Sequence, residues 1–106
     1  MIRVVFYRNS NGTWKGFSVK GHAGYAEAGK DIVCAAVSAL VINTLNSLEA
    51  FTDDSVLTEM KDGLAAMKFT SVPGSSATLL MNSLEIGLQN IRKDHDRFIQ
   101  IQYKEV

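Results

Sequence analysis

The chain has 106 residues, of which 46% are apolar and 21% are charged. This length suits one compact domain over residues 1–106, and these proportions are typical of a globular protein rather than a disordered one. Eleven Lys and Arg residues balance eleven Asp and Glu residues, and this zero net charge argues against direct nucleic-acid binding. A single cysteine can form neither an intramolecular disulfide nor a zinc site of the CxxC type, and no metal site is predicted.

Targeting signals give little support for export or membrane insertion. The N-terminus shows no charged segment followed by an apolar run, and we expect no apolar stretch of about 18 residues that could span a membrane. The chain is therefore predicted to be cytoplasmic and to make no membrane contact.

The first predicted elements are a β-hairpin, a loop and a helix. Strand-like residues fill Ile2–Arg8 and Trp14–Lys20, and the Asn11-Gly12 pair between them is a hairpin signal. A ten-residue loop follows over Gly21–Lys30, and loops of this length often carry function. A helical period then predicts a helix that starts directly after Asp31, the expected N-cap, and runs to about Ala50. Its apolar stripe is Val33, Val37, Leu40, Val41, Thr44 and Leu48.

The second half repeats this plan without evident sequence identity. A second hairpin is predicted from about Ser55 to Thr70 around the turn pair Asp62-Gly63. A helix follows Pro73, and "RFIQIQY" supplies a last strand. The helix carries a stripe of Ala77, Leu80, Met81, Leu84, Leu88 and Ile91. The predicted order is β-β-α-β-β-α-β, an α+β fold with two helices packed on a mainly antiparallel sheet.

Cys34 and His22 are candidate catalytic residues. If Asp31 is the N-cap, Cys34 lies in the first helical turn, where unpaired N–H groups and the helix dipole favour a thiolate. His22 ends the second strand, and a loop that folds back could bring its imidazole to the thiol as a general base and later an acid. Gly21, Gly24 and Gly29 would allow turns with positive φ and opening of the loop for a substrate.

Each candidate also has a structural interpretation. Cysteine often acts as a small buried hydrophobe, so Cys34 could be a core residue. Asp31 could only cap the helix, although capping and orienting His22 are compatible. Ser38, one turn after Cys34, could bond near the thiol or to its own i−4 carbonyl. His95, near a helix C-terminus, is interpreted as solvated and outside the site. Aromatic side chains that are weak candidates for peptide contact are Trp14, Phe17 and Tyr25.

The segment "GHAGYAEAGKDIVCAAVSAL" resembles the signature of the ribosomal-processing cysteine protease Prp family, small bacterial proteins. In that signature a Gly-His-Ala start leads through a loop to an aspartate, a Val-Cys-Ala and a serine, and no motif position departs from it. The chain length, the N-terminal "IRV" and the predicted element order are also similar to the family.

The resemblance implies roles for four residues. It implies that Cys34 is the nucleophile, that His22 is its base, and that Asp31 and Ser38 support the site. It further implies a homodimeric intracellular endopeptidase without a cofactor, which removes an N-terminal extension from a large-subunit ribosomal protein precursor. An apolar groove beside the first helix would suit the apolar, aromatic-containing end of that extension. A ribosome-assembly factor that only binds its partner, or a thiol redox sensor, remains an alternative.

Overall fold

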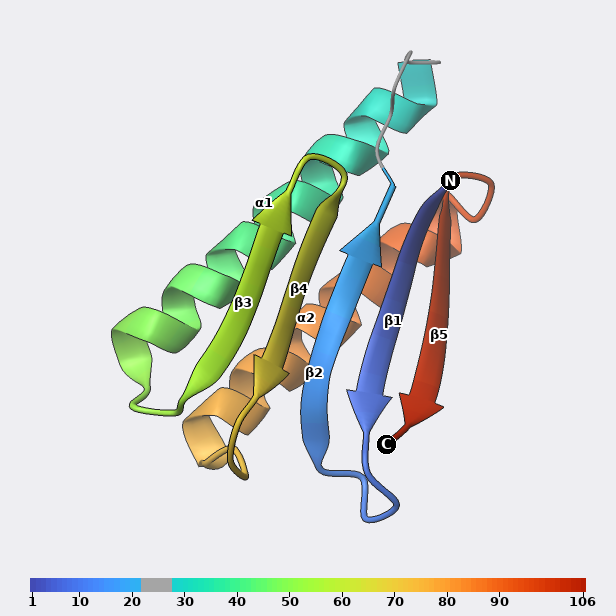
Figure 1. The fold of residues 1–106 in the computed structure, drawn as a ribbon. Helices are drawn as coiled ribbons and strands as arrows, with labels where there is room; N and C mark the ends of the chain where they lie inside the picture. The colour runs from blue at the N-terminus through green and yellow to red at the C-terminus, as the bar shows by residue number, and fades with distance from the viewer. Residues whose placement is uncertain (22–27) are drawn as a thin grey trace.

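The computed structural model describes residues 1–21 and 28–106, with side chains for residues 1–21 and 32–106. A five-stranded sheet has both helices on one of its faces, and within the described residues no helix covers the other face (Figure 1). The elements are β1 (Ile2–Arg8), β2 (Trp14–Lys20), α1 (Ala28–Phe51), β3 (Val56–Lys61), β4 (Leu64–Phe69), α2 (Ser75–Asp94) and β5 (Ile99–Glu105). The predicted α+β class and element order are confirmed.

The strands are arranged in the order β3-β4-β2-β1-β5. Neighbouring strands are antiparallel except for β1 and β5, which run parallel. The first and last strands of the chain are therefore neighbours, and β3 and β5 form the two edges of the sheet. Both predicted turn pairs lie at hairpin ends, where Gly12 and Gly63 adopt the left-handed φ values of +79° and +76°.

The core lies between the sheet and the two helices. The predicted stripe of α1 is mainly buried, with Val33, Val37, Val41 and Leu48 in the core. The predicted stripe of α2 is also mainly buried. Strand residues Val4, Phe6 and Phe17 complete the same apolar layer. The buried residues of α2 are Ala77, Met81, Leu84 and Leu88.

The start of α1 differs from the sequence prediction. The helix begins at Ala28, three residues before the predicted N-cap, so Asp31 lies inside α1 and the capping interpretation is wrong. Gly29 likewise lies in the first turn of α1 rather than in a loop. The connection between β2 and α1 is correspondingly shorter than the predicted ten residues. Alanine and lysine favour helix, so the segment can extend the helical period of the following residues despite the glycine.

The apolar character of α1 was also underestimated. Within the described residues, Ile32–Phe51 is long and apolar enough, by length and composition, to cross a membrane. The expectation that the chain has no such stretch is therefore wrong as a statement about composition. In this fold the stretch supplies buried side chains to the core, and core helices of soluble proteins share this composition.

Candidate functional site

Cys34 is half-buried on α1 and packs at the edge of the hydrophobic core. The preceding residue Val33 is buried, whereas Ile32 is 65% exposed, so the thiol lies at the border between the core and the surface. A side chain in this position contributes to packing and still presents part of its surface to an incoming molecule. The purely structural and the chemical interpretations of Cys34 are thus compatible.

The observed start of α1 changes the local chemistry proposed for this thiol. Cys34 lies six residues after Ala28, beyond the first turn, where the backbone N–H of a helical residue bonds to the carbonyl of residue i−4. The influence of the helix dipole is concentrated in the first turn. The prediction that Cys34 lies among unpaired N–H groups in the first helical turn is therefore wrong.

The structure places two of the supporting candidates on the same helix as the thiol. Ser38 is exposed and lies one turn after Cys34. The backbone of Asp31 is helical and precedes Cys34 by about one turn, while its side chain lies outside the described part of the structure. His22, Gly24 and the aromatic candidate Tyr25 also lie outside the described residues.

Gly21, the last described residue before α1, has a constrained backbone. Its φ is +90°, and its N–H donates to the carbonyl of Gly63 at 2.9 Å. A Cβ at this position would lie 2.5 Å from the carbonyl oxygen of Met1. The need for positive φ predicted at Gly21 is confirmed, and close approach by β1 gives a second reason for glycine. The end of β2 is thereby held between the β3–β4 turn and the start of β1.

The remaining sequence candidates belong to the framework. Trp14 is buried and its indole Nε1–H donates to Asn82 Oδ1 at 2.8 Å, while Phe17 is a core residue. His95 forms the C-cap of α2, where its N–H bonds to the carbonyls of Ile91 and Arg92. Among the side chains described, no three His, Cys, Asp or Glu residues gather closely enough to hold a metal ion.

The fold, with one accessible thiol on the helix after the first hairpin, corresponds to a class of small cysteine proteases. A family model described as "Cysteine protease Prp" matches residues 1–100. The chain therefore belongs to the cysteine protease Prp family, and the resemblance noted in the sequence is confirmed.

Curated relatives agree with this assignment. The chain is 28% identical to the ribosomal processing cysteine protease Prp of Staphylococcus aureus (strain Mu50) over 106 residues, which is 98% of this chain and 100% of the relative. It is also 28% identical to the protein of that name from Bacillus subtilis (strain 168), over 102 residues and 90% of both chains. The similarity thus extends well beyond the signature segment.

Solved structures share the whole fold. The S. aureus ribosomal processing protease Prp in complex with a substrate peptide superposes with a TM-score of 0.92 at 26% identity, covering 98% of this chain and 100% of that one. A complex of the same enzyme with a covalently linked product peptide gives 0.89 at 27% identity and the same coverage. SMU.848 from Streptococcus mutans gives 0.89 at 30% identity, covering 100% of this chain and 99% of that chain.

Proposed function

We propose that this protein is an endopeptidase that removes the N-terminal extension of a large-subunit ribosomal protein precursor, with Cys34 as nucleophile and His22 as general base. One observation carries the proposal: a member of a cysteine protease family needs a cysteine, and this chain has one. The names of its relatives, which are ribosomal processing proteases, support the substrate class. No metal or organic cofactor takes part.

The reaction follows the chemistry of thiol acyl transfer. His22 takes the proton from Cys34 Sγ, and the thiolate attacks the carbonyl carbon of the scissile bond to form a tetrahedral oxyanion. The C–N bond breaks as His22 gives its proton to the departing amine, which becomes the N-terminus of the mature protein. A water molecule, deprotonated by His22, then hydrolyses the thioester and releases the extension as a carboxylate, while the thiol recovers its proton.

Other parts of the site have supporting roles in this proposal. Asp31 orients the imidazole of His22, and Ser38 donates a hydrogen bond near the reacting groups. Gly21 and Gly24 give the β2–α1 connection the freedom to admit substrate, whereas Gly29 now belongs to the helix. Apolar residues of the extension would contact the exposed surface of α1, which includes Ile32 and Ile42 at 65% and 46% exposure.

The protein is further proposed to act in the cytoplasm as a homodimer. Ribosomal protein precursors are cytoplasmic substrates, which supports the location. Exposed apolar side chains on α2, Leu79 and Ile86, would be available to an interface between two copies. Sedimentation equilibrium of the purified protein tests the association state, and a single monomeric species at all concentrations would contradict the dimer.

Cleavage of a peptide that spans the extension and the first mature residues tests the function. One cut is expected with the parent protein, none with Cys34→Ala, and a rate lower by at least about 10²-fold with His22→Ala, because proton transfer contributes this much or more. His95→Ala is the matched control, since it removes the chain's other imidazole and should cleave within about threefold of the parent.

Binding of the peptide to Cys34→Ala, followed by fluorescence anisotropy, shows that this variant is folded and competent. If Cys34→Ala cuts as fast as the parent, the proposed nucleophile is wrong. Binding without any cut by the parent would favour an assembly factor, and oxidation of Cys34 without a peptide product would favour a redox sensor.

A further inference from the structure

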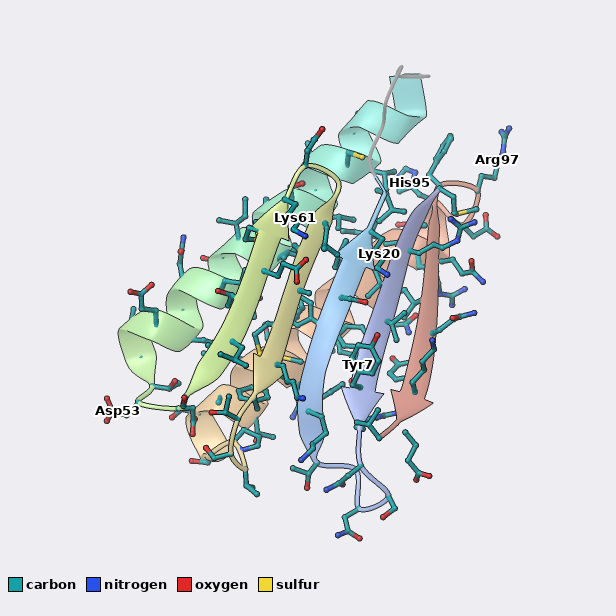
Figure 2. All side chains as sticks on the ribbon, viewed as in Figure 1. Tyr7, Lys20, Asp53, Lys61, His95 and Arg97 are labelled. Atoms are coloured by element: carbon teal, nitrogen blue, oxygen red, sulfur yellow. The ribbon has the colours of Figure 1, made fainter. Side chains whose placement is uncertain are left out.

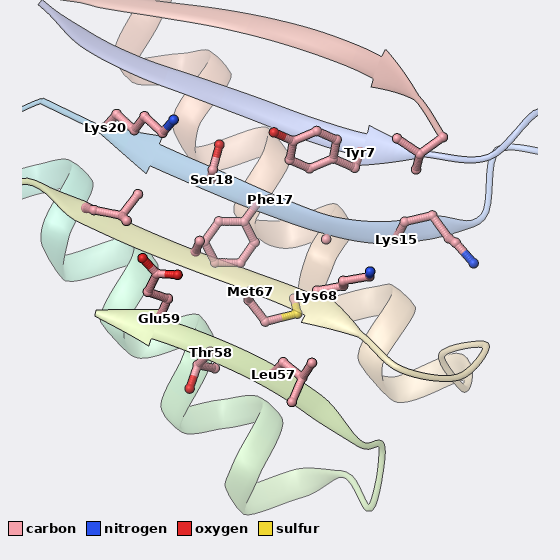
Figure 3. Close-up of a pocket in the computed structure, with 14 residues that line it drawn as sticks. Tyr7, Lys15, Phe17, Ser18, Lys20, Leu57, Thr58, Glu59, Met67 and Lys68 are labelled. Carbon is pink, nitrogen blue, oxygen red and sulfur yellow. The ribbon is translucent and has the colours of Figure 1, made fainter. Parts of the chain in front are cut away.

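The uncovered face of the sheet carries most of the described cations of the strands. Side chains alternate between the two faces of a strand, so the residues opposite the core side chains point away from the helices. Figures 2 and 3 show Tyr7 and Lys20 on this face, and Lys61 and Lys68 project from it on the neighbouring strands. We call this surface the open face.

Strand register arranges the open face in three rows that cross the sheet. Each row takes one residue from every strand in the order β3, β4, β2, β1, β5. The first row is Lys61, Leu64, Lys20, Arg3 and Gln100. The middle row is Glu59, Ala66, Ser18, Val5 and Gln102. The third row is Leu57, Lys68, Gly16, Tyr7 and Lys104. Cations therefore occupy both outer rows, and the middle row is mostly small and uncharged.

The shape of the open face follows from these rows. A hollow of about 600 Å³ lies over β2 and β4, where Gly16, Ser18 and Ala66 have little or no side chain (Figure 3). A second hollow of about 270 Å³ continues over β1 and β5, between Ser18 and Gln102. The outer rows are four residues apart along each strand, or about 13 Å at roughly 3.3 Å per residue. The open face is thus a shallow trough with a basic row on either side.

The charge of this trough is strongly one-sided. Cations that line the two hollows are Arg3, Lys15, Lys20, Lys68 and Lys104. Glu59 is the acidic side chain that lines them, and it is paired with Lys61 at 3.1 Å. Even with a carboxylate at Val106 counted, positive groups prevail. The zero net charge of the chain therefore hides a segregated charge, which composition alone does not report.

We propose that the open face binds single-stranded RNA through its phosphate backbone. A row of cations on either side of a trough fits a flexible polyanion that lies along the middle row. Tyr7 and Phe17 are the aromatic residues that line the hollows, and Phe17 is buried in the core, so base stacking is limited and binding is insensitive to sequence. A second copy of this chain is a poor occupant, because face-to-face packing would oppose like charges.

The choice of RNA over other polyanions rests on the proposed function. An enzyme that processes a ribosomal protein meets its substrate beside ribosomal RNA, and the open face lies on the side of the sheet opposite α1, which carries Cys34 (Figure 1). RNA held there would keep the protease near its substrate without occupying the thiol. Failure of this proposal can be distinguished from failure of the proposed function, because RNA binding is measured without peptide and cleavage is measured without RNA.

Fluorescence anisotropy with a labelled single-stranded RNA of about 12 nucleotides tests the proposal. The parent protein should bind with a slope of log K against log salt near about −3, as expected for about four phosphate contacts. Lys68→Glu/Lys104→Glu should weaken binding at least about tenfold and reduce that slope. The matched control Lys93→Glu/Arg97→Glu changes the net charge equally at the end of α2 and in the loop after it, and should stay within about twofold.

If the double variant Lys68→Glu/Lys104→Glu fails to fold, Lys68→Gln/Lys104→Gln replaces it. This neutral variant should lose RNA affinity to an intermediate extent. Absence of RNA binding by the parent at low salt would overturn the proposal, as would equal losses in the face and control variants. Equally tight binding of an acidic peptide, or of vesicles with anionic lipids, would also overturn it, since the face would then select negative charge alone.

Discussion

Gly16 lets the backbones of β2 and β4 approach more closely than a side chain would allow. Its φ is +153°, and a Cβ built there would collide with the carbonyl oxygen of Met67. Gly12, by contrast, has a φ of +79° in a turn with open space around it. We expect Gly16→Ala to lower the free energy of unfolding by about 3 kcal/mol or more, and Gly12→Ala by about 1 kcal/mol, because only the first adds a collision to backbone strain.

Urea unfolding of both variants checks this difference. Equal losses in the free energy of unfolding would show that β2 and β4 can move apart to accept the added Cβ without a further loss of stability. The need for glycine at position 12 could be predicted, because Asn11-Gly12 is a local turn signal. The need at position 16 could not, since it arises from Met67 on a strand far away in the sequence.

The candidate site was predictable at the level of residue type and less so in local geometry. Cys34 is the chain's one cysteine, so its importance follows from the sequence and the family. The predicted position of Cys34 in the first helical turn was wrong, because that prediction took Asp31 as the N-cap from its residue type. Local preference for a cap was overridden when Ala28–Lys30 joined the helix. The pairing of Cys34 with His22 stays a prediction.

At the scale of elements, Tyr103 joins the edge strand β5 to α2. Its hydroxyl donates to Glu85 Oε2 at 2.5 Å and accepts from Gln89 Nε2 at 2.9 Å. Burial raises the pKa of Tyr103 above its usual value of 10.0, and the hydrogen bond to Glu85 adds to this shift. The guanidinium of Arg8 lies 4.5 Å from the ring centre.

The raised pKa of Tyr103 means that the folded state prefers the neutral phenol. Its contribution to stability is complete below the unfolded pKa near 10.0 and is lost as the pH rises through the higher folded pKa. We therefore expect the melting temperature to fall less between about pH 9 and 11 in Tyr103→Phe than in the parent. Thermal unfolding followed by circular dichroism across this range is the measurement, and identical slopes would refute the linkage.

Helix stripes and hairpins were predictable because their signals are local. Val33, Val37 and Val41 recur at helical spacing, and they are buried as expected. The position of β5 beside β1 was not predictable, because parallel pairing joins segments about 97 residues apart, such as Ile2 and Ile99, without any local turn signal. The sequence predicted a mainly antiparallel sheet but no strand order.

At the scale of the whole molecule, both halves of the chain share one core. Phe6 is fully buried in β1 and its ring centre lies 5.4 Å from that of Trp14, the chain's one tryptophan. Phe6→Ala should cost about 3–5 kcal/mol, yet unfolding should remain a single transition. Trp14 fluorescence and far-ultraviolet circular dichroism should report the same midpoint, and two separate midpoints would contradict a shared core.

Charge at this scale shows why composition can mislead. Eleven cations and eleven anions cancel in the sequence, and the sequence therefore predicts no direct nucleic-acid contact. Strand register gathers Arg3, Lys20, Lys68 and Lys104 on one face, away from most carboxylates. Alternation along one strand is readable from the sequence, but the alignment of rows across five strands needs the register.

The pairing of β1 with β5 affects the order in which the sheet can form while the chain is being translated. Among the strands, β1 is made first and β5 last, so the edge of β1 that pairs with β5 stays unpaired until β5 has left the exit tunnel of the ribosome. Until then the sheet on which α1 packs lacks its β5 edge. The parallel contact between β1 and β5 can therefore form only after both hairpins and both helices have been synthesised.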